Sequence, residues 1–163
     1  MDNPATENSP LHTRETCSDP LIYRRAEFVA WADVRFGRIV CLRIPQVISP
    51  EITPKALSYI KEKKDPLPYP AQQPHQFYLT SDLQNDINMA WATGLSAFNL
   101  ATEPVTTNDL VAILAPEIAG SVTKTEEKYP QPVTTFYSIH KDSKSGFIYP
   151  KDYILEKIKE LYT

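Results

Sequence analysis

The sequence predicts an α+β domain in which a small antiparallel sheet, or a set of hairpins, packs against about four helices. Strand-like segments occur towards both ends of the chain, and a run of helix-like segments separates them. Fifteen prolines divide these segments, whereas only four glycines are present. With 163 residues and 42% hydrophobic content, the chain is long enough for one core, so residues 21–163 are expected to form a single domain.

Residues 1–20 are polar, contain three prolines and hold almost no apolar side chains. Such a segment buries too little apolar surface to offset the entropy of ordering, so we expect a disordered N-terminal arm. The arm also lacks the apolar stretch of a secretory signal peptide, and no apolar run approaches the ~20 residues of a membrane span. We therefore expect a cytoplasmic protein with no membrane partner.

The first strand is expected at residues 38–44, which are rich in β-branched and apolar residues. Alternation places Val40, Leu42 and Ile44 on one face of this strand. Residues 26–34, which come before it, fit two structures equally well. They form either the hairpin partner of the strand or a short helix, and periodicity does not decide between them.

A helix is expected to begin at Thr53-Pro54, because threonine is a common N-cap and proline suits the first helical position. It is expected to run to about residue 64. Four prolines among residues 65–74 then favour an extended connector of the polyproline II type.

The strongest helical pattern covers residues 82–101 and predicts one amphipathic helix of about five turns. Its apolar positions follow helical spacing and are Leu83, Ile87, Ala90, Trp91, Gly94, Leu95 and Phe98. Trp91 is therefore expected to be buried on this stripe. Gly94 is expected on the same buried side, where it would let another backbone approach closely.

Three further elements complete the prediction. A short helix is expected to begin at Thr107-Asn108-Asp109 and to cover residues 110–115. Residues 133–140 alternate cleanly, and residues 147–149 return as a second short strand, which together predict a hairpin. A final helix is expected to begin at Pro150, because its apolar positions Ile154 and Ile158 are one turn apart.

Charge is segregated along the chain. Residues 65–123 contain no lysine or arginine but six acids, whereas all six arginines lie between Arg14 and Arg43. Clustered charge of one sign either pairs with the opposite cluster inside the fold or faces a partner of opposite sign. These two explanations are equally good from sequence alone.

The charge pattern, the absence of a catalytic motif and nine tyrosines favour a non-catalytic acidic protein-binding module, such as an inhibitor, an immunity-type protein or an adaptor. Its partner is expected to be a protein with a basic surface, and a homo-oligomer is an additional option. Asp82, Asp86 and Asp109 are the expected charged contacts, with Tyr69 and Phe77 as apolar contacts. A net charge of −3 argues against a nucleic-acid partner.

No metal site or cofactor is expected, because the three histidines have no neighbouring ligands at metal-binding spacing and no glycine opens a phosphate-binding turn. The alternative is a small enzyme with a scattered site that uses Cys41 or His140, both expected on strands. A cysteine in an apolar strand is more often an inert core residue, which favours the binding module.

Overall fold

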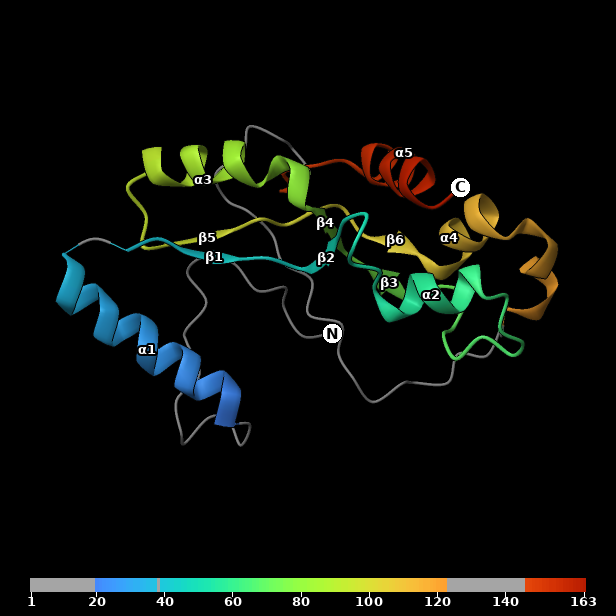
Figure 1. Ribbon diagram of the computed structural model, residues 1–163, viewed down its shortest axis with the longest axis horizontal. Helices are drawn as coiled ribbons and strands as arrows, with labels where there is room; N and C mark the ends of the chain where they lie inside the picture. The colour runs from blue at the N-terminus through green and yellow to red at the C-terminus, as the bar shows by residue number, and fades with distance from the viewer. Residues whose placement is uncertain (1–19, 38, 123–145) are drawn as a thin grey trace.

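The computed structural model describes residues 20–37, 39–122 and 146–163, and these residues form a mixed helix-and-strand fold of the α+β kind (Figure 1). Its helices are α1 (Pro20–Phe36), α2 (Lys55–Lys61), α3 (Leu83–Ala92), α4 (Thr107–Leu114) and α5 (Lys151–Tyr162), with the short 3-10 helices η1 (Thr80–Asp82) and η2 (Pro116–Ser121). Its strands are β1 (Cys41–Arg43), β2 (Gln46–Ile48), β3 (Pro74–His75), β4 (Phe77–Leu79), β5 (Ala97–Asn99) and β6 (Val105–Thr106). Residues 1–19 of the expected arm and the strand expected at 133–140 lie outside the described residues.

The strands form three separate pairs within the described part of the chain. β1 pairs with β5 and β2 pairs with β4, both in parallel, whereas β3 and β6 are antiparallel. The expected antiparallel sheet is therefore found only in part. Parallel strands need a long crossover, and the segment between β2 and β4, which contains α2, provides one. Sequence adjacency alone favours hairpins and does not reveal such crossovers.

Strand β4 separates two apolar cores because successive side chains of a strand point to opposite faces. Phe77 and Leu79 belong to the larger core, which α2, α4 and α5 enclose. Tyr78, between them, belongs to a smaller core beneath α3. The larger core comprises Ile48, Leu57, Ile60, Leu67, Phe77, Leu79, Val105, Leu110, Val111, Ala115, Val122, Ile154 and Ile158.

The long helix expected over residues 82–101 is wrong in its second half. α3 ends at Ala92, Gly94 adopts a left-handed φ of 75°, and the chain continues as β5. A left-handed glycine is a common way to end a helix. The apolar spacing across residues 82–101 therefore comes from a helix followed by a strand, and not from one long helix. Gly94 is exposed with no atom near its absent Cβ, and Trp91 is 51% exposed, so neither has the buried place expected for it.

The structure decides the alternative at residues 26–34 in favour of a helix. α1 begins at Pro20, and Gly37 follows its last residue with a φ of 73°. Proline at the first position and glycine after the last are the usual signals at helix ends. The expected strand at 38–44 is present as β1, and Val40, Leu42 and Ile44 all pack against the smaller core.

The remaining helices agree with the sequence prediction, with shifted ends. α2 begins at Lys55, with Pro54 rather than Thr53 at its N-cap, and ends at Lys61 rather than near residue 64. α5 begins at Lys151, directly after Pro150. α4 begins at Thr107, within the Thr107–Asp109 segment expected to start it, and Thr106 and Asp109 form a capping box at its N-terminus. No helix among the described residues is both long and apolar enough to cross a membrane.

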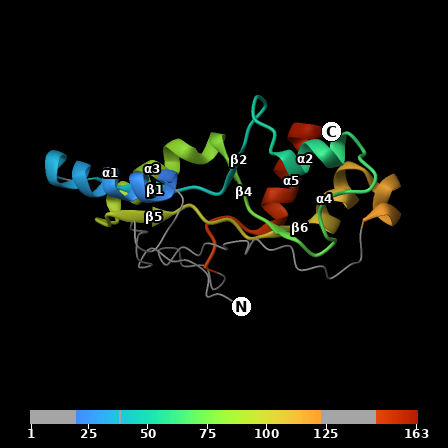
Figure 2. The same ribbon diagram turned by 90° about the horizontal axis from the view of Figure 1, so that it is seen from below.

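Figures 1 and 2 show that the helices gather at two ends of the molecule. Helices α2, α4 and α5 lie at one end, next to the β3–β6 pair. Helices α1 and α3 lie at the other end, where the β1–β5 pair runs between them in Figure 1. The two strands of the β2–β4 pair connect these ends.

Candidate functional site

The structure places Asp82 and Asp86 in a network of tyrosine hydroxyls. Tyr78 donates to Asp86 at 2.7 Å, and Tyr149 lies 3.1 Å from both carboxylate oxygens of Asp86. Tyr153 donates to Asp82, with distances of 3.1 and 3.2 Å to its two oxygens. The Tyr149 and Tyr153 rings stack with their centroids 5.0 Å apart. The network joins β4, η1 and α3 to α5 and to the segment that precedes it.

Burial controls the protonation of this network. Asp86 is only 5% exposed. Burial, and then the adjacent Asp86 carboxylate, raise the pKa of Tyr78 and Tyr149 far above the ordinary tyrosine value. Burial and Asp82 raise the pKa of Tyr153 as well. The three hydroxyls therefore keep their protons at neutral pH and act as hydrogen-bond donors, which suits a structural contact better than proton transfer.

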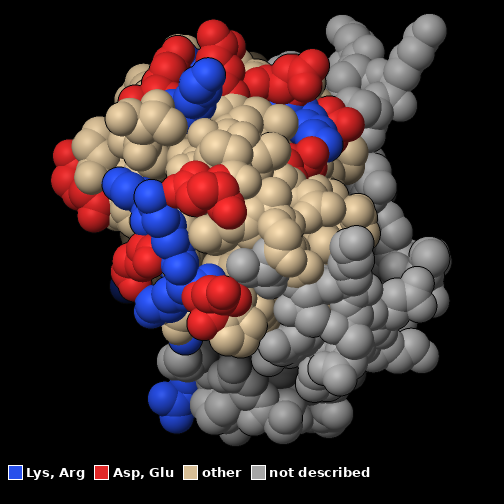
Figure 3. All heavy atoms as spheres, turned by 90° about the vertical axis from the view of Figure 1, so that its right-hand side faces the viewer, with Lys and Arg blue, Asp and Glu red and all other residues tan. Residues whose placement is uncertain are grey.

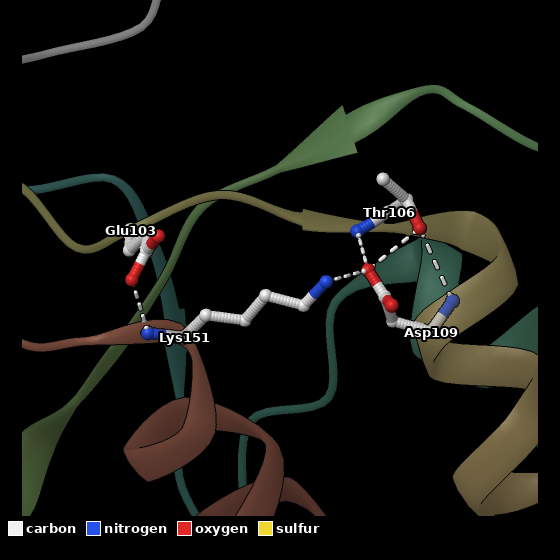
Figure 4. A network of polar contacts seen from close by, with 4 residues as sticks. All are labelled: Glu103, Thr106, Asp109 and Lys151. Carbon is white, nitrogen blue, oxygen red and sulfur yellow. Dashed lines mark hydrogen bonds and ion pairs between the residues drawn. The ribbon is translucent and has the colours of Figure 1, made fainter.

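Asp109 lies in a second network, which connects the start of α4 to the start of α5 (Figure 4). It accepts hydrogen bonds from the backbone N–H and the hydroxyl of Thr106, and its carboxylate lies 2.8 Å from Nζ of Lys151. The backbone N–H of Lys151 donates to Glu103 at 2.8 Å. Burial would raise the pKa of Asp109, but the Lys151 and Thr106 contacts outweigh it and hold that pKa below its ordinary value.

Tyr69 and Phe77 belong to a chain of aromatic contacts that passes through His75. The His75 ring stacks on Phe77 at a centroid distance of 5.9 Å and meets Tyr69 edge-on at 5.5 Å. Nε2 of His75 is 3.1 Å from the hydroxyl of Thr107, and burial lowers the pKa of His75 to about 4. Phe77 is fully buried and Tyr69 is half-buried, so Phe77 lies in the core of this structure.

Five of the six acids in residues 65–123 make contacts within the protein. Asp82 and Asp86 accept from tyrosines, Glu103 from a backbone N–H, and Asp109 and Glu117 form ion pairs with Lys151 and Lys63. The sequence suggested internal pairing with arginines, whereas the side-chain partners of these five acids are tyrosines and lysines, of which Tyr78 lies within the acidic segment and the others outside it. Figure 3 shows acidic and basic side chains interspersed at the end of the molecule formed by α4 and α5.

The large exposed apolar side chains lie mainly on α1 and α3, and sequence reasoning did not identify them as candidates. On these two helices they are Phe28, Trp31, Val34 and Phe36 of α1 and Ile87 and Trp91 of α3. On α1, the Trp31 ring lies 5.8 Å from Phe28 and 6.1 Å from Phe36, measured between centroids. One signal in the sequence could have revealed α1, because arginines are interspersed with aromatic residues along this segment.

The alternative enzymatic site stays a prediction. Cys41 is half-buried on β1, opposite Ala97 of β5, and its proposed partner His140 lies outside the described residues. In the parts of the chain that the structure describes, no three His, Cys, Asp or Glu side chains are arranged to hold a metal ion.

Comparison with protein-family models found no match, and neither did comparisons with curated proteins and with solved structures.

Proposed function

We propose that this protein is a non-catalytic protein-binding module that contacts its partner through the exposed apolar side chains of α1 and α3. The main support for the proposal is the exposure of two tryptophans, Trp31 of α1 by 55% and Trp91 of α3 by 51%. Figure 1 places these two helices at the same end of the molecule. Large apolar side chains gathered on a surface mark interaction sites, and tryptophan is enriched among the residues that dominate binding energy.

The expected acidic contacts support binding less well than these apolar residues do. Asp86 is buried, and Asp82 and Asp109 each accept hydrogen bonds from within the protein. A partner that contacted these carboxylates would have to replace those hydrogen bonds with its own. Recognition of a basic protein through Asp82, Asp86 and Asp109 stays a prediction.

A comparison of two variants tests the proposal. The tagged full-length chain is used to capture proteins from its natural host, and each captured protein is then purified and titrated calorimetrically. We expect the double variant Trp31→Ser, Trp91→Ser to lose binding, because each tryptophan contributes apolar contact area. The double variant Asp82→Asn, Asp109→Asn should keep most of it.

Circular dichroism of both variants provides the folding control. Full binding by the folded tryptophan variant would overturn the proposal. Loss of binding by a folded Asp82→Asn, Asp109→Asn variant alone would instead support recognition through the acidic residues.

A further inference from the structure

One face of helix α1 carries a narrow stripe in which two aromatic residues lie between two arginines. The stripe consists of Arg24, Phe28, Trp31 and Arg35, at steps of four, three and four residues. At 100° per residue these positions fall within about 60° of one another, so they lie on one face. All four side chains are exposed, Phe28 by 63%. Two aromatic rings are therefore bracketed by two guanidinium groups.

The position of α1 leaves this stripe accessible. The most extensive packing among the described elements joins α2, α4 and α5 and the strand pairs, and α1 takes no part in it. In Figures 1 and 2 the helix lies at the end of the molecule farthest from α4 and α5. With 17 residues it is about 25 Å long, which suffices to fill a groove on another protein.

Building on the proposed protein-binding function, we infer that α1 binds as a helix in an apolar groove whose rim is acidic, on a different protein. Phe28 and Trp31 would enter the groove, and Arg24 and Arg35 would pair with carboxylates at its two ends. Tryptophan and arginine are the residues most enriched at binding hot spots, and arginine forms two parallel hydrogen bonds with a carboxylate.

Charge complementarity identifies the partner as acidic. α1 itself contains three arginines and two acids, a charge of +1 within a chain of −3, and both charged residues of the stripe are arginines. A surface of this sign attracts a partner of opposite charge and disfavours a basic one. The partner inferred here therefore differs from the basic partner that the acidic segment led us to expect.

A second copy of the chain fits less well as the protein that binds α1. Residues 65–123, the long segment without lysine or arginine, hold six of its twenty acids, and five of those six make internal contacts, as described above. A lipid surface also fits less well. Helices that lie on membranes keep their charges on the face opposite the apolar one, whereas Arg24 and Arg35 share the face of Phe28 and Trp31.

The test uses the full-length chain with the photoreactive residue p-benzoylphenylalanine in place of Val34. Val34 is 89% exposed and lies beside the stripe, so all four stripe residues are retained. The matched control carries the same residue in place of Ile52, which is exposed in the segment between β2 and α2. Irradiation in the natural host should yield an adduct with one other protein from position 34 only.

Calorimetry with the purified crosslinked protein then tests the chemistry of recognition. We expect the variant Arg24→Glu, Arg35→Glu to bind at least about 30-fold more weakly, the loss typical of hot-spot residues. The variant Arg24→Lys, Arg35→Lys should lose less affinity, because lysine keeps the positive charge and lacks only the two parallel hydrogen bonds that arginine forms with a carboxylate. The crosslinked peptide should contain apolar residues next to Asp or Glu.

Several results would overturn the inference. An adduct of twice the chain's own mass would identify a second copy as the occupant. Sedimentation with vesicles of phosphatidylserine and phosphatidylcholine, without a protein adduct, would identify a membrane. No adduct from position 34, or unchanged affinity after charge reversal, would also overturn it. If the partner requires Trp91 and not the stripe, the inference fails while protein binding stands; if it requires neither helix, both fail.

Discussion

The two ends of this molecule use large apolar side chains in opposite ways. At the end built from α2, α4 and α5, residues such as Leu57, Leu110 and Ile158 are fully buried in one core. At the end built from α1 and α3, Trp31 and Trp91 are more than half exposed. Apolar surface that stays in water contributes nothing to the free energy of folding. The large apolar side chains of the second end therefore stabilise the fold less than those of the first end.

This difference shows that hydropathy patterns do not separate folding surfaces from binding surfaces. In α5, Ile154 and Ile158 are one turn apart and both are buried. In α1, Phe28 and Trp31 have equally helical spacing and both are exposed. The distinguishing feature of α1 is that arginines share the apolar face, because a charged group on a core-facing stripe would have to be desolvated.

The largest expected difference between the ends comes from truncating one aromatic residue in each. Phe77→Ala should lower the free energy of unfolding by about 3–5 kcal/mol, because it leaves a cavity in the larger core. Trp91→Ala should lower it by about 1 kcal/mol, because half of that side chain is already in water. Urea denaturation monitored by circular dichroism measures both. Equal losses would show that Trp91 contributes to a core.

The pH dependence of stability is expected to depend on His75, at the well-packed end. Burial keeps the folded-state pKa at about 4, whereas the unfolded chain takes up a proton near pH 6.5. Stability should therefore be complete above pH 6.5 and fall by about 3 kcal/mol as the pH decreases to 4. Urea midpoints measured across this range test the prediction. The His75→Gln variant, which cannot be protonated, should lack this part of the decrease, and an unchanged profile would contradict it.

Within the tyrosine network, removing the hydroxyls of Tyr149 and Tyr153 is expected to have smaller effects on stability, and the two effects should differ in size. Tyr149→Phe removes a donor from the buried Asp86 and should cost about 1.5–3 kcal/mol, because hydrogen bonds to charged groups are strong. Tyr153→Phe removes a hydrogen bond to Asp82, which is less buried, and should lower the free energy of unfolding by about 0.5–1 kcal/mol. Thermal unfolding of the two variants gives the ranking. The reverse order would show that Asp82 is the more important carboxylate.

The sequence predicted those elements whose ends carry their own signals. Pro54 and Pro150 mark the starts of α2 and α5, and the apolar segment around β1 was identified as a strand. The pairing of β1 with β5 and of β2 with β4 was not predictable, because contacts between distant segments leave no local pattern. Gly94 was a helix-ending signal, but the apolar spacing on both sides of it concealed that role.

The candidate site was predicted in part for a similar reason. Asp82, Asp86 and Asp109 were expected at or near helix starts, and that is where they lie. Their bonds to Tyr153, Tyr149 and Lys151 join residues more than forty positions apart, and a linear charge pattern does not reveal them. The exposed side of α1 was missed because burial is a property of the assembled fold.

The smallest expected effect compares two valines in helices at the two ends. Val111 of α4 is buried in the larger core, so Val111→Ala should destabilise the protein by about 2 kcal/mol. Val34 of α1 is almost fully exposed, so Val34→Ala removes little contact and gains helix propensity. It should stabilise the protein by at most about 0.5 kcal/mol, which urea midpoints of both variants can detect. Destabilisation by more than about 1 kcal/mol at Val34 would show that α1 folds against the rest of the chain, and that its exposed side chains serve stability rather than binding.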